Sequence, residues 1–442
     1  MSLPLVGIRV IDFSRVLAGP HCAKTLLDLG ADVVKIEPPS GDLSRKAFPS
    51  KGEISGYYAQ QNAGKRNLSI DLNVAGARDV VAKLCDDADV IVENFRPGAL
   101  AAFGLDYETV SVTNPRVVYA SISGYGQHGP FRSRMAYAPT VQAETGITAN
   151  TMEHFGQTGS MRSDALSHAD VYSGLHAAIA ILAALASRER TGVGQYIDVA
   201  MAAVMMSVNE RVHVDLSDED LGDERPILGA TDGPFFQGPN GERFASPMSL
   251  VGSMSFPFYL AAMRRPDLAD DPRFLTPELR LRNLGALHQI VQDWIGTFSD
   301  MESLDAQMDE AKIATGQLRT VKEFAASDWA QAWHAVRTVP DRQGGEIRIP
   351  GRPWHFNELI APGEEQFAAR QGEHNSKLLA EIGYRPEDIA RLEESGALVE
   401  PNRDCGSSDF AGTVSVVTAA AVADPASEPV DANYFDLKKS AR

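Results

Sequence analysis

The sequence predicts an α/β fold: a large domain built on a mostly parallel sheet, followed by a smaller α+β domain. Over the first 125 residues, short apolar runs rich in β-branched residues alternate with amphipathic segments. This alternation is typical of parallel strands joined by helices that cover both faces of a sheet. After Met201 a polar, acidic stretch replaces this pattern. The length of 442 residues is enough for two or three such domains.

The elements of the large domain follow in chain order. The β-branched runs predict strands at 6–13, 32–36, 68–72, 89–94 and 117–122, and the segments between them predict helices at 20–29, 75–87 and 107–113. Ligands of such sheets collect at the carboxyl ends of the strands. The segments 14–20 and 94–98 each follow a strand and are therefore candidate binding loops. The first predicted strand is not followed by a GxGxxG, so a dinucleotide site is not predicted there.

A run of Ala, Ile and Leu over 171–186 predicts a helix that is buried on most sides. Thr191-Gly192 ends it, and a strand is predicted over 195–201. Asp170 stands just before this helix, where free N–H groups favour an ionised carboxylate. Taken alone, such an aspartate is most often an N-cap.

The chain is predicted to leave the large domain and to return to it. We expect the large domain over 1–206, a linker over 207–229, the small domain over 230–320, a returning linker over 321–352 and the rest of the large domain over 353–399. In the small domain, Pro239-Asn240-Gly241 predicts a hairpin turn, and Asn283 is the expected N-cap of a helix over 284–297. Residues 400–442 are expected to form a flexible tail.

Composition excludes several kinds of partner. The formal net charge of −18 argues against nucleic acid, because phosphate binding needs a basic surface. One acidic small ligand needs only a few cations, and the candidates in the first third are Arg15, Lys35, Lys65, Arg66 and Arg96. Each of these, taken alone, is more often a solvated surface charge.

Three widely spaced cysteines predict neither a disulfide framework nor a zinc site. No segment has the pattern of a signal peptide, and the longest apolar stretch, 177–186, is too short to span a bilayer. The sequence therefore predicts a cytoplasmic protein without a membrane partner.

Six further segments, in order, carry a family resemblance together with the region 159–201 around Asp170. They are LVGIRVIDFSRVLAGPHCAKTLLDLGADVVKIEPPSGD (5–42), NAGKRNLSIDL (62–72), VENFRPGALAAFGLDY (92–107), SGYGQHGP (123–130), RRPDLADDPRF (264–274) and GEHNSKLLAEIGY (372–384). This set, spread over residues 5–398, resembles the family III CoA-transferases, the CaiB/BaiF group. That group includes formyl-CoA transferase, carnitine CoA-transferases and α-methylacyl-CoA racemases.

The resemblance implies transfer of coenzyme A from an acyl-CoA to a small carboxylic acid, with neither a metal nor a tightly bound cofactor. It implies that Asp170 is the nucleophile, which forms a mixed anhydride and then an aspartyl-CoA thioester. With an ordinary pKa near 4 the carboxylate would be ionised without a general base. The rival carboxylate, Asp164, does not match the family position. The family also implies a homodimer of two chains linked like rings.

The same resemblance implies the residues that contact CoA. Residues 16–18 match a loop beside the adenine, Asn94 and Phe95 match a strand-end loop, and Tyr137 matches an aromatic position near the thioester. Lys35 matches a place where a cation near the phosphates is usual. The expected CoA-binding set is therefore Val16, Leu17, Ala18, Lys35, Asn94, Phe95, Arg96 and Tyr137. Core packing is an equal alternative for Phe95 and for Tyr137.

Two departures from the family leave alternatives open. The segment 249–255 has one glycine where many members have several, so either a stiffer closure over the aspartate or a differently shaped acceptor pocket is expected. An α-methylacyl-CoA racemase needs a histidine base, but Tyr137 stands at that position, and His128 lies nine residues earlier. A tyrosine with an ordinary pKa near 10 is a poor base. The remaining alternative is a CoA-ester binding protein without catalysis.

Overall fold

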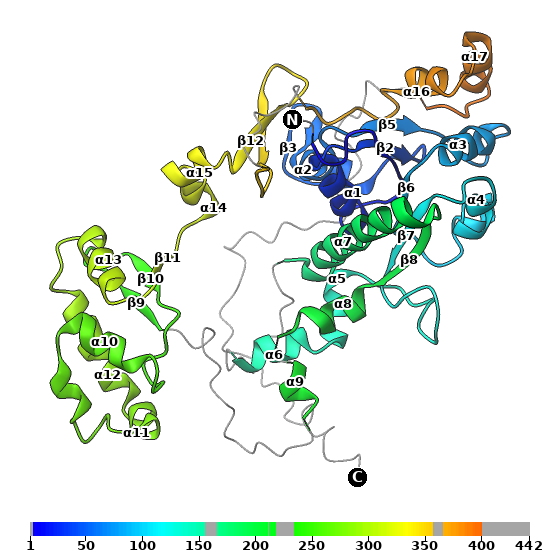
Figure 1. Cartoon of the computed structure of the whole chain (residues 1–442). Helices are drawn as coiled ribbons and strands as arrows, with labels where there is room; N and C mark the ends of the chain where they lie inside the picture. Colours follow the sequence, from blue (N-terminus) through cyan, green and yellow to red (C-terminus); the bar gives the residue numbers. More distant parts are fainter. Residues whose placement is uncertain (1–2, 155–165, 211, 218–233, 357–365, 400–442) are drawn as a thin grey trace, which may run out of the picture. The chain divides into compact units, whose positions relative to one another are not determined.

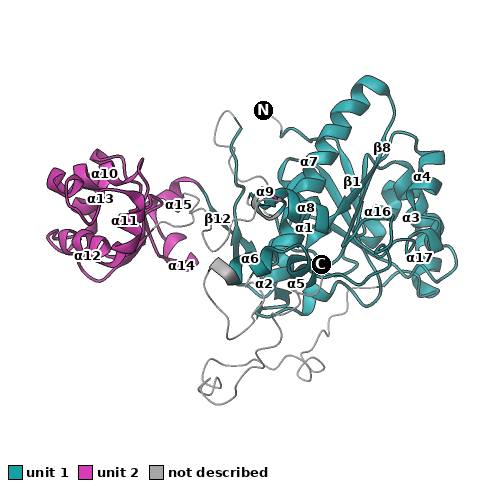
Figure 2. Ribbon diagram, turned by 90° about the horizontal axis from the view of Figure 1, so that it is seen from below, with its two compact units in different colours: residues 1–216, 334–442 teal, residues 217–333 magenta. Residues whose placement is uncertain are grey.

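The computed structural model describes residues 3–154, 166–210, 212–217, 234–356 and 366–399 (Figure 1). They divide into two compact units, one formed by residues 1–216 and 334–442 and the other by residues 217–333 (Figure 2). The predicted tail, 400–442, and most of the acidic linker, 218–229, lie outside the described residues.

The first unit is built on a six-stranded sheet with the order β5-β2-β1-β6-β7-β8, and every neighbouring pair is parallel. This confirms the predicted α/β class and the parallel sheet. The strands are β1 (Arg9–Asp12), β2 (Asp32–Glu37), β5 (Arg66–Ser69), β6 (Val90–Glu93), β7 (Val118–Ser123) and β8 (Gln195–Ala200). From β1 the chain adds β2 and β5 on one side and then β6, β7 and β8 on the other. The carboxyl ends of β1 and β6 therefore form a topological switch point, which is where sheets of this kind bind ligands.

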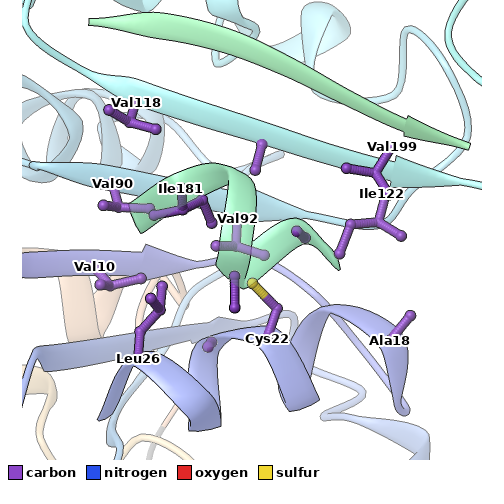
Figure 3. Close-up of a cluster of buried hydrophobic side chains, with 14 of the residues drawn as sticks. Val10, Ala18, Cys22, Leu26, Val90, Val92, Val118, Ile122, Ile181 and Val199 are labelled. Carbon is purple, nitrogen blue, oxygen red and sulfur yellow. The ribbon is translucent and has the colours of Figure 1, made fainter. Parts of the chain in front are cut away.

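Alternating residues of the strands supply two separate cores, one on each face of the sheet. Val10 of β1 belongs to the core under α1 (Ala18–Asp28) and α7 (His168–Thr191), as Figure 3 shows. The next residue, Ile11, belongs to the opposite core. That core is covered by α3 (Ala77–Asp86), α4 (Tyr107–Thr113), α16 (Asn375–Glu381) and α17 (Pro386–Glu394). The two groups of helices lie on opposite sides of the sheet in Figure 2.

Helix α7 is longer than predicted and begins before Asp170. Its N-cap is Ser167, so Asp170 lies in the first turn and is not the cap residue. The helix packs closely on α1 at Gly174, where an added Cβ would come within 2.5 Å of the Ala18 carbonyl oxygen. The absence of a side chain at this position therefore fixes how near the two helices approach.

By length and composition, α7 is also the one described helix that could cross a membrane, which the prediction from the shorter stretch 177–186 missed. In the structure it packs against α1, β7, α5 (Ala138–Glu144) and α8 (Met201–Val208). Its apolar residues belong to the core that lies between α1 and the sheet, and we therefore interpret α7 as a core helix.

The segment 321–352, which the sequence predicted as a returning linker, contains helices and strands of its own. Residues 321–333 form α14 (Val321–Phe324) and α15 (Asp328–Ala332) of the second unit. Residues 336–350 form a hairpin of β12 (Val336–Pro340) and β13 (Glu346–Pro350) that packs on α2 (Gly56–Asn62) in the first unit. The remaining elements of this unit are β3 (Ser50–Lys51), β4 (Ile54–Ser55), α6 (Ile147–His154) and α9 (Val212–Asp215).

The second unit has a three-stranded antiparallel sheet and several short helices. The hairpin of β9 (Phe235–Gln237) and β10 (Arg243–Ala245) turns at Gly241, whose φ of +90° is readily adopted only by glycine, and this confirms the predicted turn. Asn283 precedes the predicted helix but makes no side-chain cap bond. The other elements are α10 (Phe256–Met263), α11 (Pro277–Arg282), α12 (Leu284–Ile295), α13 (Met301–Glu310) and β11 (Gly316–Gln317).

We expect Gly174→Ala to destabilise the first unit by about 2–4 kcal/mol, because the new methyl group meets backbone atoms that cannot rotate away. Thermal unfolding followed by circular dichroism measures this loss. Gly56→Ala is the matched control, since its Cβ would meet only the Pro49 carbonyl oxygen at 3.4 Å. Equal melting temperatures for the two variants would contradict the close approach of α1 and α7.

Candidate active site

The two loops at the switch point are joined by one side chain. Asn94, which follows β6, accepts a hydrogen bond from the Arg15 backbone N–H at 2.8 Å and donates one to the Arg15 carbonyl oxygen at 2.9 Å. This reciprocal pair fixes the loop after β1 to the loop after β6. The structure therefore brings the predicted residues 16–18 together with Asn94 and Phe95 at one edge of the sheet.

Two arginines at this edge are available to an acidic ligand. The Arg15 guanidinium lies 5.3 Å from the centre of the half-buried Phe95 ring, and Arg96 is exposed. Neither arginine forms an ion pair with a described residue. Phosphates or carboxylates approaching this edge would therefore meet two cations that no described residue neutralises.

The other three candidate cations are already paired within the fold. Lys35 is fully buried, with its Nζ 2.9 Å from an Asp42 carboxylate oxygen and 2.7 Å from the Ser14 carbonyl oxygen. Lys65 is buried beside Asp12 at 2.8 Å. The expectation that Lys35 reaches the CoA phosphates does not fit this burial, because its ammonium group has no surface exposed to a ligand.

Arg66 is likewise occupied, since it pairs with Asp32 and, at 2.6 Å, with Glu381. Its partners lie at the amino end of β2 and on α16, and the ion pairs hold α16 against the sheet. The sequence showed five cations and gave no sign of which were paired.

Asp170 differs from the acids around the two loops because its carboxylate forms no hydrogen bond or ion pair with any described residue. The side chain is partly buried at the start of α7. Burial raises its pKa to about 6, which corrects the expectation of an ordinary value. At neutral pH the group is mostly ionised, poorly hydrated and free to form a bond.

A buried glutamine holds the segment that carries Asp170. Gln142, on α5, accepts a hydrogen bond from the Ala169 backbone N–H at 3.3 Å, and its amide nitrogen lies 3.4 Å from the Leu166 carbonyl oxygen. It thereby uses one of the free N–H groups at the start of α7. No sequence pattern marked Gln142, because its partners are backbone atoms that lie about 25 residues away.

Tyr57, on α2, is a second residue that sequence analysis missed. Burial and the negative charges of Asp170 and Asp42 raise the pKa of its phenol to about 12, so the hydroxyl stays neutral. Because the charge of Asp170 acts on it, Tyr57 is a neighbour of the candidate nucleophile. A neutral phenol can donate a hydrogen bond to an oxygen that gains negative charge there.

Tyr137 is the N-cap residue of α5 and is 67% exposed, which excludes the core-packing alternative for this residue. Its backbone N–H donates to the Thr140 hydroxyl at 3.0 Å. His128, the other candidate from the racemase alternative, is exposed in the turn after β7. The described residues contain no cluster of three or more His, Cys, Asp or Glu side chains that could hold a metal ion.

The burial of Asp170 predicts a pH-dependent cost to stability. A folded pKa of about 6, above the ordinary 3.8, means that ionisation disfavours the folded state as the pH rises from about 4 to 6. We expect Asp170→Asn to be more stable than the parent chain at pH 8, by up to about 3 kcal/mol, and equally stable near pH 4. Urea unfolding at the two pH values tests this. A stability difference that is the same at both would contradict it.

Comparison with known proteins identifies the family. Residues 5–375 match the model of CoA-transferase family III. The chain is 31% identical over 423 residues to the formyl-CoA:oxalate CoA-transferase of Streptomyces avermitilis, covering 90% of this chain and 100% of that protein. It is 32% identical over 393 residues to the succinate–glutarate CoA-transferase of Agrobacterium fabrum, with 86% and 96% covered.

Solved structures agree with these matches. A CaiB/BaiF family protein from Brucella suis is similar with a TM-score of 0.71 and 28% sequence identity, covering 86% of this chain and 100% of that one. Because the matched stretch contains the whole parallel sheet, both switch-point loops and Asp170, the chain belongs to family III of the CoA-transferases and is an enzyme of that class.

Proposed function

We propose that this enzyme transfers CoA from an acyl-CoA donor to a small carboxylic acid, with Asp170 as the nucleophile. The observation that carries the proposal is the state of the Asp170 carboxylate, which is desolvated and has no partner among the described residues. A carboxylate kept only for structure would be hydrogen-bonded or paired, as Asp12 and Asp42 are.

The first half of the proposed reaction moves CoA onto the enzyme. An Asp170 oxygen attacks the thioester carbonyl carbon, the C–S bond breaks, and CoA leaves as the thiolate. This forms a mixed anhydride between Asp170 and the acyl group. The thiolate then attacks the Asp170 carbonyl carbon, which releases the donor acid as a carboxylate and leaves an aspartyl-CoA thioester.

The second half repeats these steps with the acceptor. The acceptor carboxylate attacks the aspartyl thioester and expels the thiolate, and the thiolate attacks the acceptor carbonyl carbon of the new anhydride. The acceptor leaves as its CoA ester, and Asp170 is regenerated as a carboxylate. No proton or electron is gained or lost, so the cycle needs no general base, metal or redox cofactor. We propose that Tyr57, whose phenol feels the charge of Asp170, donates a hydrogen bond to the oxyanions that form there.

The substrates follow from the chemistry of the switch-point edge and from the relatives. Arg15 and Arg96 suit the phosphates of CoA, while the acceptor must present a carboxylate to Asp170. The relatives are named for oxalate, succinate and glutarate, which are small dicarboxylic acids. We therefore propose a small carboxylic acid of this kind as the acceptor, and a cytoplasmic enzyme without a tightly bound cofactor.

We expect Asp170→Ala to abolish CoA transfer while CoA still binds, because the variant removes only the reacting carboxylate. Transfer is measured by mass spectrometry with panels of acyl-CoA donors and free acids. Asp164→Asn is the matched control, since it alters the rival carboxylate of the same segment. Activity of Asp170→Ala within about tenfold of the parent, a barrier change near 1.4 kcal/mol, would place the nucleophile elsewhere.

Hydroxylamine separates the transferase from a CoA-ester binding protein without catalysis. It attacks an aspartyl thioester, so we expect loss of activity only when acyl-CoA and hydroxylamine are present together. Mass spectrometry should then find the modification on the peptide that contains Asp170. Full activity after this treatment would show that no such thioester forms.

We expect no enzyme-dependent exchange of the α-proton of a 2-methylacyl-CoA with solvent deuterium. Racemisation needs a base beside the substrate, and Tyr137 replaces the histidine that a racemase carries there. Incubation in deuterium oxide followed by mass spectrometry measures the exchange. Rapid deuterium uptake that depends on this enzyme would favour the racemase over the transferase.

We also propose that the enzyme is a homodimer of linked rings, as the family resemblance implies. The chain passes between its two units twice, at residues 216–217 and 333–334. Linked rings separate only when one of them unfolds, so we expect a dimer that persists on dilution. Sedimentation at nanomolar concentration tests this. A chain that ends at Glu400 tests whether the predicted tail after that residue is dispensable. A folded monomer would contradict the linkage.

A further inference from the structure

A buried pair of opposite charges lies beneath the loop that follows β1. Lys35 and Asp42 are 0% and 1% exposed, and their charged atoms are 2.9 Å apart. Asp42 also accepts hydrogen bonds from the Ser44 N–H at 2.9 Å and from the Ser44 hydroxyl at 2.8 Å. Burial alone would raise the pKa of Asp42, but Lys35 and Ser44 outweigh it and lower it to about 2. Asp42 is therefore a fixed anion across the working pH range.

This anion faces the backbone of a strained residue. Both Asp42 carboxylate oxygens accept from the Val16 N–H, at 3.2 and 3.3 Å. Val16 has φ +67°, in the left-handed region that β-branched residues very seldom adopt. A conformation of this kind persists only where surrounding contacts hold it, and such residues gather at functional sites.

The neighbouring residues of the loop are held just as firmly. Lys35 donates to the Ser14 carbonyl oxygen at 2.7 Å, and Asn94 makes its two bonds to the Arg15 backbone. With this backbone fixed, Ser14 and Leu17 are buried while the Val16 side chain is 39% exposed. One apolar side chain of the loop is thus turned outward at the switch point.

We propose that Asp42, supported by Lys35, is a positioning residue that holds Val16 in the left-handed conformation, so that the loop 15–17 is preformed to bind the CoA moiety. This inference rests on the proposed function, because it assigns the loop to CoA. A preformed loop loses little conformational entropy when the ligand binds, whereas a loop that must be ordered lowers the affinity. Asp42 acts through the backbone of Val16 and has no contact of its own with the ligand.

Calorimetric titration with CoA tests this without requiring turnover. We expect Asp42→Asn to raise the Kd for CoA at least tenfold, because an amide cannot accept from Lys35, Ser44 and Val16 together. KM for the acyl-CoA should rise in parallel, with kcat changed much less. Asp341→Asn is the matched control: Asp341 is also a buried carboxylate that accepts backbone N–H bonds, from Gln343 and Gly345, but it lies in the turn between β12 and β13. Its Kd should stay within twofold.

The same substitution in a Val16→Gly background shows whether Asp42 acts through Val16. Glycine adopts positive φ without strain, so Asp42→Asn should then raise the Kd no more than about threefold. An equal effect in both backgrounds would overturn the proposal, as would an unchanged Kd for folded Asp42→Asn. If Asp42→Asn does not fold, Ser44→Ala keeps the charge and should raise the Kd about threefold, and an unchanged Kd there would overturn the proposal too. Failure of the parent chain to bind CoA would instead refute the proposed function.

Discussion

Two buried ion pairs at the carboxyl ends of β1 and β2 are the constraint on which the site depends. Each ion loses several kcal/mol of hydration when buried, and only complete pairing offsets this cost. The Lys65 ammonium meets that condition with Asp12 at 2.8 Å, the Pro20 carbonyl oxygen at 2.9 Å and the Asn62 amide oxygen at 3.0 Å. On the neighbouring strand β2, the Lys35 ammonium is paired with Asp42 and donates to the Ser14 carbonyl oxygen. Together they join the sheet, the loop after β1 and the helix α2.

The position of the candidate nucleophile follows from these pairs through the packing of helices. The loop leads directly into α1, whose first turn is anchored by the bond from Lys65 to Pro20. Helix α7 then lies against α1 at the distance that Gly174 permits, and Gln142 holds its first turn. Asp170 is therefore held in place without any described contact of its carboxylate, which leaves that group unpartnered.

Acids near the switch point have opposite electrostatic surroundings. Burial acts on each of them, but cations and hydrogen bonds outweigh it at Asp12 and Asp42 and lower the pKa of both. At Asp170 burial acts alone and raises the pKa to about 6. The same side chain thus is a permanent structural anion at two positions, and at the third it is the carboxylate that we propose as the nucleophile.

The sequence by itself determined the elements and their order, because hydrophobic periodicity is a local property. It predicted β1, β2, β6 and β7, the turn at Gly241, a buried helix over 171–186 next to Asp170, and the two loops that meet at the edge of the sheet. Only the tertiary structure decided the partners of charged and polar side chains. Lys35 looked like a phosphate ligand but is neutralised by Asp42, and Gln142 and Tyr57 carried no local signal. Such pairings join residues far apart in the chain, and burial, which sets their strength, exists only after folding.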